Sequence, residues 1–178
     1  MSKIGLFYSS STGNTKEAAN AIKAEFDKHE DDLVTLHYVT DGPLTDMLAY
    51  ETLVLGVPTW DIGELEADWD SVFHEMEELD LSGKKVAVFG LGDQFGYPDS
   101  YQDALGLLAK KARERGAELV GFTPTESHEF DESAALENDQ FMGLALDEDN
   151  QANQSAERIT AWVAQLVREF QLGTRESA

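Results

Sequence analysis

The chain has 178 residues, of which 42% are hydrophobic and 10% aromatic, as expected for one soluble globular domain. It contains no cysteine, which excludes a disulfide framework, a thiolate zinc site, an iron–sulfur cluster and a cysteine nucleophile. The chain has 13 Lys and Arg residues and 35 Asp and Glu residues, so the formal net charge is −22. This charge repels nucleic acid and anionic membranes and attracts basic protein faces, although it is equally compatible with a salt-tolerant or simply very soluble protein.

The first residues, Met1 to Thr15, carry one lysine and only a short apolar run. This run is too short for the core of a signal peptide or for a membrane span. We therefore expect a cytoplasmic protein.

Five short apolar runs alternate with helical patterns along the chain, which predicts five strands separated by helices. The predicted strands are Ile4 to Tyr8, Leu33 to Val39, Leu53 to Val57, Val86 to Phe89 and Leu119 to Phe122. The first helix, near Thr15 to Lys28, follows strand one. The apolar stripes of the other helices contain Trp69, Val72, Phe73 and Met76, then Ala104, Leu105, Leu108 and Ala112, and finally Ile159, Trp162, Val163, Leu166 and Phe170.

Strands that are apolar throughout need cover on both faces, which is typical of a parallel sheet between two layers of helices. About thirty residues, Thr123 to Asn153, separate strand five from the last helix, and a structureless loop of that length is uncommon. A second apolar piece, Phe141 to Leu146, lies within it. We therefore predict an insertion that splits strand five, in one domain of residues 1–171 with a loose tail, 172–178.

The loop after strand one, Ser9 to Thr15, is rich in hydroxyl groups and leads into a helix. Ligands of open parallel sheets bind at the carboxyl ends of the strands, and a helix N-terminus attracts anions. The loop lacks the Gly-Lys-Ser/Thr ending of a P-loop, so it suits a terminal phosphate held by neutral donors. An ordinary cluster of helix-capping residues explains the same composition.

The loop after strand three, Pro58 to Glu64, places Trp60 beside glycine and polar residues. A tryptophan in such a loop is a candidate platform for stacking a planar ring. Core tryptophans are commoner, and Trp69 and Trp162, which lie on helical stripes, fit that role better.

The loop after strand four, Gly90 to Tyr97, contains three glycines that allow the backbone to approach a flat ligand. Tyr97 can supply a second aromatic face. The spacing is not that of a dinucleotide-binding motif, so this loop is a weak signal alone and a strong one together with the other two.

With these three loops the chain resembles the flavodoxin family over nearly all of its length, roughly Lys3 to Phe170. The matching stretches are Leu6 to Thr15, Pro58 to Trp60, Gly63-Glu64 with Asp68-Trp69, Gly92 to Gln94 with Gly96-Tyr97, and Gly143 to Asp147. The insertion in strand five looks like that of the long-chain bacterial subgroup. Ser127-His128 departs from the Gly-Tyr that long-chain members often have there.

The resemblance implies an α/β, doubly wound, five-stranded parallel sheet in the order 2-1-3-4-5, with a non-covalent FMN at its edge. The implied phosphate site is Ser10, Ser11, Thr12, Gly13, Asn14 and Thr15. Trp60 would cover the inner face of the flavin ring and Tyr97 the outer face. The implied contacts at the ring are Pro58, Thr59, Asp61, Ile62, Leu91, Gly92 and Asp93, with the Asp61–Ile62 peptide as the partner of flavin N5.

The function implied is that of a low-potential electron carrier rather than an enzyme. Carboxylates near the ring, Asp61 and Asp93 among them, would disfavour the anionic reduced flavin, which leads us to expect cycling mainly between semiquinone and hydroquinone. We expect a monomer with redox partners that have basic docking faces, such as a ferredoxin/flavodoxin–NADP reductase, and no binding of nucleic acid, membranes or metal.

Two other functions are compatible with this topology. An FMN-dependent NAD(P)H–quinone reductase of the flavodoxin-like superfamily would need a substrate pocket over the ring, which Tyr97 would close. A response-regulator receiver would need an acidic pair after strand one, where this chain has Ser9-Ser10. The four histidines of the chain are scattered and none lies in the three loops, so no machinery for turning over a substrate is apparent.

Overall fold

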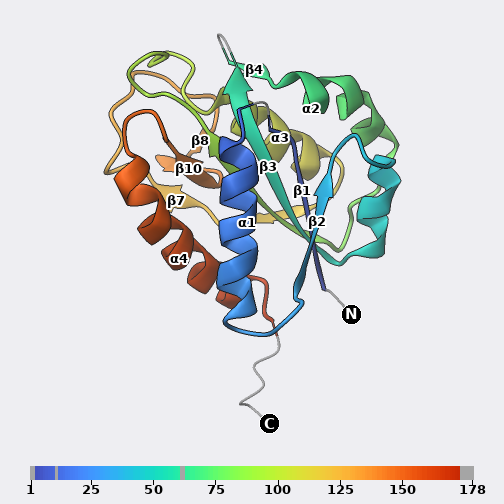
Figure 1. The fold of residues 1–178 in the computed structure, drawn as a ribbon. Helices are drawn as coiled ribbons and strands as arrows, with labels where there is room; N and C mark the ends of the chain where they lie inside the picture. The colour runs from blue at the N-terminus through green and yellow to red at the C-terminus, as the bar shows by residue number, and fades with distance from the viewer. Residues whose placement is uncertain (1–2, 11, 61–62, 173–178) are drawn as a thin grey trace.

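The computed structural model describes residues 3–10, 12–60 and 63–172. A parallel sheet forms its centre, in the order β10-β5-β3-β1-β2 with β6 also paired to β5 (Figure 1). Its strands are β1 (Ile4–Tyr8), β2 (Val34–Tyr38), β3 (Thr52–Trp60), β5 (Lys85–Leu91), β6 (Glu118–Val120) and β10 (Leu144–Leu146). A two-residue strand, β4 (Glu64–Leu65), pairs antiparallel with the end of β3. The predicted strand order, 2-1-3-4-5, is confirmed.

Helices cover both faces of this sheet (Figure 1). α1 (Asn14–Asp27) and α4 (Ala152–Glu169) pack on one face, against a core that includes Ile22 and Trp162. The opposite face is covered by α2 (Ala67–Val72), α3 (Asp103–Glu114) and two 3₁₀ helices, η1 (Leu44–Ala49) and η2 (Phe73–Glu78). None of the described helices is long and apolar enough to cross a membrane.

The alternating side chains of each central strand divide between these two cores. In β5, Val86 and Val88 point to the α3 side, whereas Ala87 and Phe89 point to the α1 and α4 side. All four are fully buried, as the unbroken apolar pattern predicts for a strand with cover on both faces.

The two tryptophans on helical stripes are core residues, as predicted. Trp69 and Trp162 are buried, and their indole nitrogens donate to the carbonyl oxygens of Gly56 and Gly121, each at 2.8 Å. The stripe that contains Trp69 is not one continuous helix, however, because α2 ends at Val72 and η2 continues from Phe73.

Strand five is split, as predicted. β6 pairs with the first half of β5 and β10 with its second half, and residues 121–143 form the insertion between them. A small antiparallel sheet lies in the insertion, made of β7 (Thr123–Pro124), β8 (Leu136–Glu137) and β9 (Gln140–Phe141). Only Leu144–Leu146 of the second apolar piece therefore rejoins the main sheet, since Phe141 belongs to β9. Of the predicted tail, Leu172 packs against the core and residues 173–178 lie outside the described residues.

Gly143 allows the chain to rejoin the sheet. A Cβ atom at this position would lie 1.9 Å from the carbonyl oxygen of Val88, far inside van der Waals contact with a backbone atom that cannot turn away. Any larger residue would therefore push β10 away from β5.

We expect Gly143→Ala to lower the free energy of unfolding by more than about 2 kcal/mol, because the added methyl group overpacks against backbone. Gly83→Ala is the matched control: Gly83 has φ +82° but nothing within 4 Å of a Cβ, so it carries only the strain of about 1 kcal/mol. Urea denaturation measures both, and a loss at Gly143 no larger than at Gly83 would contradict this account.

Candidate functional site

A pocket lies at the carboxyl ends of β1, β3, β5 and β10. The space it encloses is partly open to solvent, as expected for a cleft that binds a ligand at the surface. Of the residues predicted to bind a ligand, nine line it: Thr12, Asn14, Thr15, Pro58, Thr59, Leu91, Gly92, Asp93 and Tyr97. Three loops predicted from different parts of the sequence thus meet in one place.

The first loop supplies hydrogen-bond donors at the start of α1. Gly13 is the N-cap residue, in a left-handed conformation with φ +98° that an L side chain rarely adopts. The hydroxyl of Ser10 accepts from the amides of Gly13 and Lys16, at 3.1 and 3.3 Å. Within the described chain, the amides of Asn14 and Thr15 have no such acceptor. This end of α1 therefore offers two free N–H groups, aided by the helix dipole, to an anion in the pocket. Ser11 lies outside the described residues.

Tyr38, at the end of β2, holds this loop from the side. Its hydroxyl accepts from the amide of Ser10 at 3.3 Å and also lies 3.1 Å from the carbonyl oxygen of Ser10. A carboxylate oxygen of Asp68 accepts from the same hydroxyl. Burial and this carboxylate raise the pKa of Tyr38 to about 12, so the hydroxyl stays protonated and available as a donor.

The second loop is described only in part. Pro58 and Thr59 line the pocket, and the hydroxyl of Thr59 accepts from the amide of Ala104 in the first turn of α3 at 3.1 Å. The backbone of Trp60 ends β3 and pairs with Glu64, but its side chain and all of Asp61 and Ile62 lie outside the described part of the chain.

The third loop presents backbone and one exposed ring. The carboxylate of Asp93 accepts from the amides of Phe95 and Gly96 at 3.1 and 2.7 Å, which fixes the turn. Burial alone would raise the pKa of Asp93, but the hydrogen bonds from Gly96, Asn150 and Phe95 outweigh it and lower this pKa. The side chain of Tyr97 is 46% exposed while it lines the pocket, so its ring is free to cover a ligand.

Five residues that the sequence analysis did not assign also line the pocket: Ser100, Tyr101, Gln102, Glu148 and Asp149. The acidic run that begins at Asp147 has the pattern of a solvated surface, yet Asp147 is fully buried and accepts from the amide and side chain of Gln94 at 3.0 and 2.7 Å. The rule that ligands bind at the carboxyl ends of strands could have found this run, because it follows β10.

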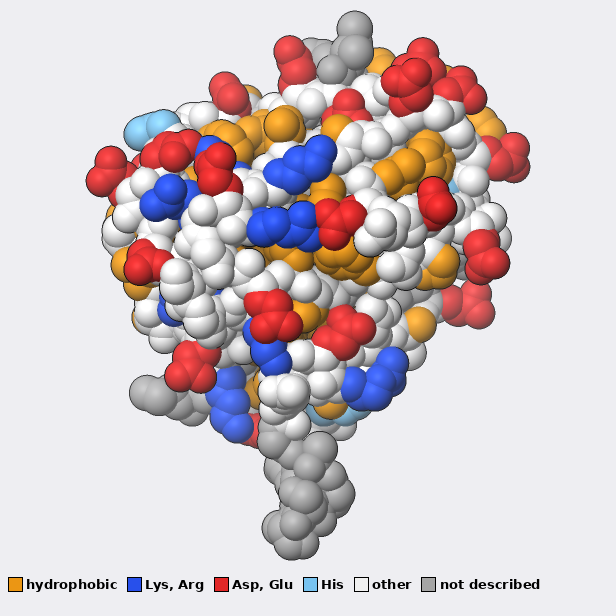
Figure 2. All heavy atoms as spheres, turned by 180° about the vertical axis from the view of Figure 1, so that it is seen from behind, with side chains coloured by type: hydrophobic (Ala, Val, Ile, Leu, Met, Phe, Trp, Pro, Cys, Tyr) orange, Lys and Arg blue, Asp and Glu red, His pale blue; other side chains and the backbone are white. Residues whose placement is uncertain are grey.

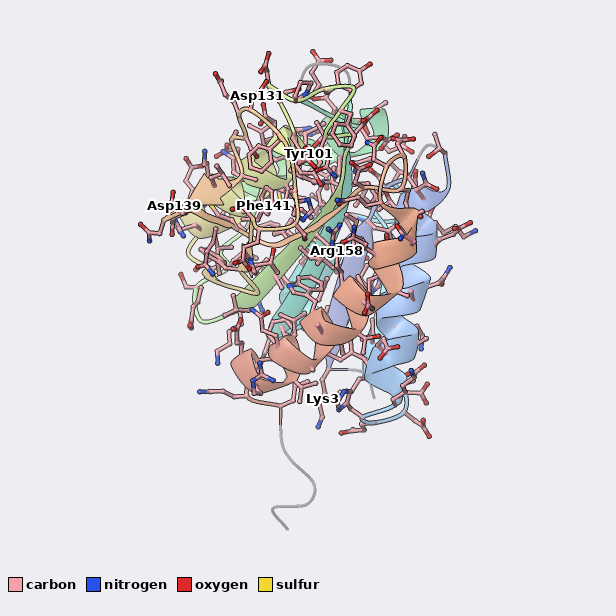
Figure 3. All side chains as sticks on the ribbon, turned by 90° about the vertical axis from the view of Figure 1, so that its left-hand side faces the viewer. Lys3, Tyr101, Asp131, Asp139, Phe141 and Arg158 are labelled. Atoms are coloured by element: carbon pink, nitrogen blue, oxygen red, sulfur yellow. The ribbon has the colours of Figure 1, made fainter. Side chains whose placement is uncertain are left out.

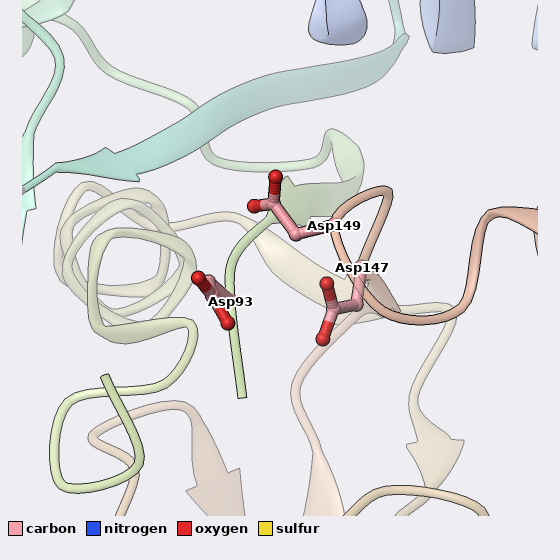
Figure 4. A group of neighbouring side chains, drawn as sticks. All are labelled: Asp93, Asp147 and Asp149. Atoms are coloured by element: carbon pink, nitrogen blue, oxygen red, sulfur yellow. The ribbon is translucent and has the colours of Figure 1, made fainter. Parts of the chain in front are cut away.

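Asp93, Asp147 and Asp149 converge at the edge of the pocket (Figure 4), with carboxylate oxygens within 4.8 Å of one another. Burial, together with Asp93, Asp147 and Glu148, raises the pKa of Asp149. The result is a local concentration of negative charge beside the pocket.

Tyr101 forms the wall behind Gly92 and is 1% exposed. Its hydroxyl lies 2.9 Å from Nδ1 of His128 in the insertion. Burial, reinforced by the positive charge of Arg158, lowers the pKa of His128 to about 4, and Asp147 opposes this change only in part. His128 is therefore neutral near pH 7.

This lowered pKa predicts a pH-dependent stability. As the pH drops from 6.5 to about 4, the unfolded chain takes up a proton at this position that the folded protein does not. The free energy of unfolding therefore decreases as the pH drops through this range and becomes constant below it. Relative to His128→Asn, which does not titrate, we expect the parent to lose about 2 kcal/mol in urea denaturation, after allowance for partial solvent screening. A difference that stays constant from pH 7 to 4 would contradict the lowered pKa.

The described residues that line the pocket include no Lys, Arg or His. The arrangement offers neutral donors at one end, glycine-rich backbone and an aromatic ring at the other, and carboxylates at the edge. This arrangement can hold a flat, phosphorylated ligand.

The chain matches the flavodoxin family model over residues 6–162. It is 49% identical over 170 residues to a flavodoxin of Nostoc sp., covering 96% of this chain and 98% of that protein. Flavodoxin 2 of Escherichia coli is 45% identical over 169 residues, covering 94% of this chain and 96% of its own length.

The fold is also similar to a solved structure, that of Fusobacterium nucleatum flavodoxin bound to flavin mononucleotide. The TM-score is 0.88 at 34% sequence identity, covering 95% of this chain and 99% of that one. Since the family model spans most of the chain and these relatives match nearly all of it, the protein belongs to the flavodoxin family.

Proposed function

We propose that the pocket at the carboxyl edge of the sheet binds one FMN and that the protein carries electrons between redox proteins. The observation that carries this proposal is the convergence of the open start of α1, the glycine-rich third loop and the exposed ring of Tyr97 on one pocket. Membership of the flavodoxin family makes the protein an electron carrier rather than an enzyme.

The residues present fit FMN. Gln102 lines the pocket, and its buried side-chain oxygen, which lies beside Gly90, has no hydrogen-bond partner within the described chain. The buried hydroxyl of Ser9, where β1 ends, also lacks one. Unsatisfied buried polar atoms are costly and indicate a missing partner. A Cβ atom at Gly13 would meet nothing within 4 Å, so the entrance beside the α1 amides is open.

The site assignment follows the three loops. Hydroxyl and amide groups of Ser10, Ser11, Thr12, Gly13, Asn14 and Thr15 bind the phosphate, Trp60 and Tyr97 cover the ring, and Pro58, Thr59, Asp61, Ile62, Leu91, Gly92 and Asp93 contact it. The Asp61–Ile62 peptide faces flavin N5. To this set we add Gln102 and Asp149, because both line the same pocket.

Bound FMN supplies one-electron redox chemistry. The carboxylates of Asp93, Asp147 and Asp149 place negative charge beside it, and Asp61 is expected to add to this charge. Negative charge disfavours further reduction of a bound group, so these residues lower the potential at which the protein gives up its electrons.

The surface supports docking of basic partners. The net charge is −22, and basic side chains of α3 are engaged locally: Lys111 pairs with Glu77 and Glu114, and Arg113 with Glu137. On the face in Figure 2, acidic side chains lie mainly around the rim, and basic side chains lie nearer the centre with acidic ones among them. Near the pocket, Phe95 and Tyr97 are 59% and 46% exposed and offer an apolar contact at its rim.

Charge complementarity of this kind favours fast association with partners that have a basic face, such as a ferredoxin/flavodoxin–NADP reductase. We further propose that residues 1–171 form the FMN-binding domain, with residues 172–178 as its C-terminal tail, and that the protein acts as a cytoplasmic monomer.

The first test is FMN uptake. We expect protein stripped of its ligand to bind FMN one to one, and Trp60→Ala and Tyr97→Ala each to raise the Kd at least about tenfold, or 1.4 kcal/mol, with little change in folding. Phe95→Ala is the control, since this exposed ring does not line the pocket, and it should stay within about twofold. Fluorescence titration measures all four proteins. Failure of the parent to bind would refute the function, and unchanged affinity in both aromatic variants would refute the site.

A second test separates the phosphate end from the ring end. Tyr38→Phe removes the hydroxyl that holds Ser10, so we expect the Kd for FMN to rise about tenfold while that for riboflavin, which lacks the phosphate, changes less than about twofold. Tyr50→Phe removes a half-buried tyrosine–histidine hydrogen bond, to His37 at 2.7 Å, and should alter neither affinity. Equal losses for FMN and riboflavin in Tyr38→Phe would argue against a phosphate site here.

A further inference from the structure

The insertion, residues 121–143, packs behind the third loop of the pocket. Its backbone amides donate to that region at several points: Glu129 to the side chain of Gln94, Asp131 and Glu132 to the carbonyl oxygen of Pro98 at 2.8 and 2.9 Å, and Ala134 to the carboxylate of Asp103 at 2.6 Å. These hydrogen bonds therefore fix the segment that leads from β5 to α3 on the side away from the pocket. None of the described residues of the insertion lines the pocket itself.

His128 differs from these contacts because it acts through its side chain. Among the described residues of the insertion, it alone forms a side-chain hydrogen bond to the segment between β5 and α3, through Nδ1 to the hydroxyl of Tyr101. Its ring also packs against Phe141, with ring centroids 5.0 Å apart.

The backbone beside His128 is fixed in turn by α4 and the turn that precedes it. The carbonyl oxygen of Ser127 accepts from the side chain of Gln151 at 2.8 Å, and its hydroxyl accepts from the guanidinium of Arg158 at 2.9 Å. Figure 3 shows Arg158, Tyr101 and Phe141 on this side of the molecule. These hydrogen bonds fix the backbone next to His128 and so limit where its ring can lie against Tyr101.

Tyr101 in turn contacts the backbone of the pocket. A Cβ atom at Gly92 would lie 3.2 Å from the ring of Tyr101, so the ring packs directly against the backbone of the third loop. The amide of Gly92 donates to the carbonyl oxygen of Leu146 at 3.0 Å, which places this backbone between Tyr101 and β10. A change in the position of the Tyr101 ring would therefore move the backbone that faces the pocket.

We infer that His128 is a positioning residue for the flavin pocket: it holds the hydroxyl of Tyr101 and thereby keeps the Gly92 backbone at the position that FMN requires. The inference rests on the proposed function for its ligand. Without His128, the hydroxyl of Tyr101 would lose its partner in the insertion and keep only its hydrogen bond with the side chain of Gln102. The ring would then shift or admit water to restore the lost bond.

Affinity measurements test the hydrogen bond itself. We expect His128→Phe, which keeps a ring but removes the acceptor, to raise the Kd for FMN about tenfold, and His128→Asn, which restores a polar atom near the position of Nδ1, to stay within about threefold of the parent. Tyr101→Phe combined with His128→Phe should bind no more weakly than His128→Phe alone, because both changes remove the same bond. Losses that simply add in the double variant, or a parent-like Kd in His128→Phe, would overturn the inference.

Amide hydrogen exchange in protein stripped of FMN gives a second readout that does not depend on the ligand. We expect the amides of Gly92 and Gln94 to exchange about tenfold faster in His128→Phe than in the parent. In Tyr50→Phe they should exchange at the parent rate even where its urea midpoint falls, since that contact lies away from the pocket. If the parent binds no FMN, the proposed function fails and the exchange rates alone decide: faster exchange in His128→Phe supports the positioning role, and unchanged exchange overturns it.

Discussion

Burial of both faces of the central sheet is the constraint from which the rest of this structure follows. Because α1 and α4 cover one face and α2, α3 and the 3₁₀ helices cover the other, the strands can carry only apolar side chains along most of their length. Polar groups become available only where the strands end. The hydroxyl-rich, glycine-rich and acidic segments after β1, β5 and β10 therefore meet at one edge, where they form a pocket rather than scattered surface features.

Most of this fold could be predicted from the sequence, because five apolar runs separated by helical stripes allow few arrangements. The exact point at which the chain rejoins the sheet could not. Phe141 and Leu144 are both apolar, and local pattern does not distinguish them. The choice depends on the close approach of Gly143 to the carbonyl group of Val88, which belongs to a strand more than fifty residues earlier. The break between α2 and η2 likewise leaves the apolar stripe unchanged and is invisible to periodicity.

The pocket was predictable where a loop has an unusual composition, as at Ser9 to Thr15 and Gly90 to Tyr97. It was not predictable where ordinary residues acquire a role from distant partners. Asp147 has the sequence context of a solvated residue, but the donors that compensate its burial include the distant Gln94 as well as the neighbouring Asn150. His128 is isolated in the sequence and gains significance only because the insertion brings it to Tyr101. Ser11, Asp61, Ile62 and the side chain of Trp60 remain predictions from the family resemblance.

The start of α1 has one more consequence. A helix normally completes its first turn with its own capping side chain, but here Gly13 cannot provide one, and Ser10 reaches the amides of Gly13 and Lys16 rather than those of Asn14 and Thr15. Among the described residues, no side chain caps these two amides. Under the proposed function the phosphate of the ligand would cap them, so that ligand binding would also complete the first turn of α1.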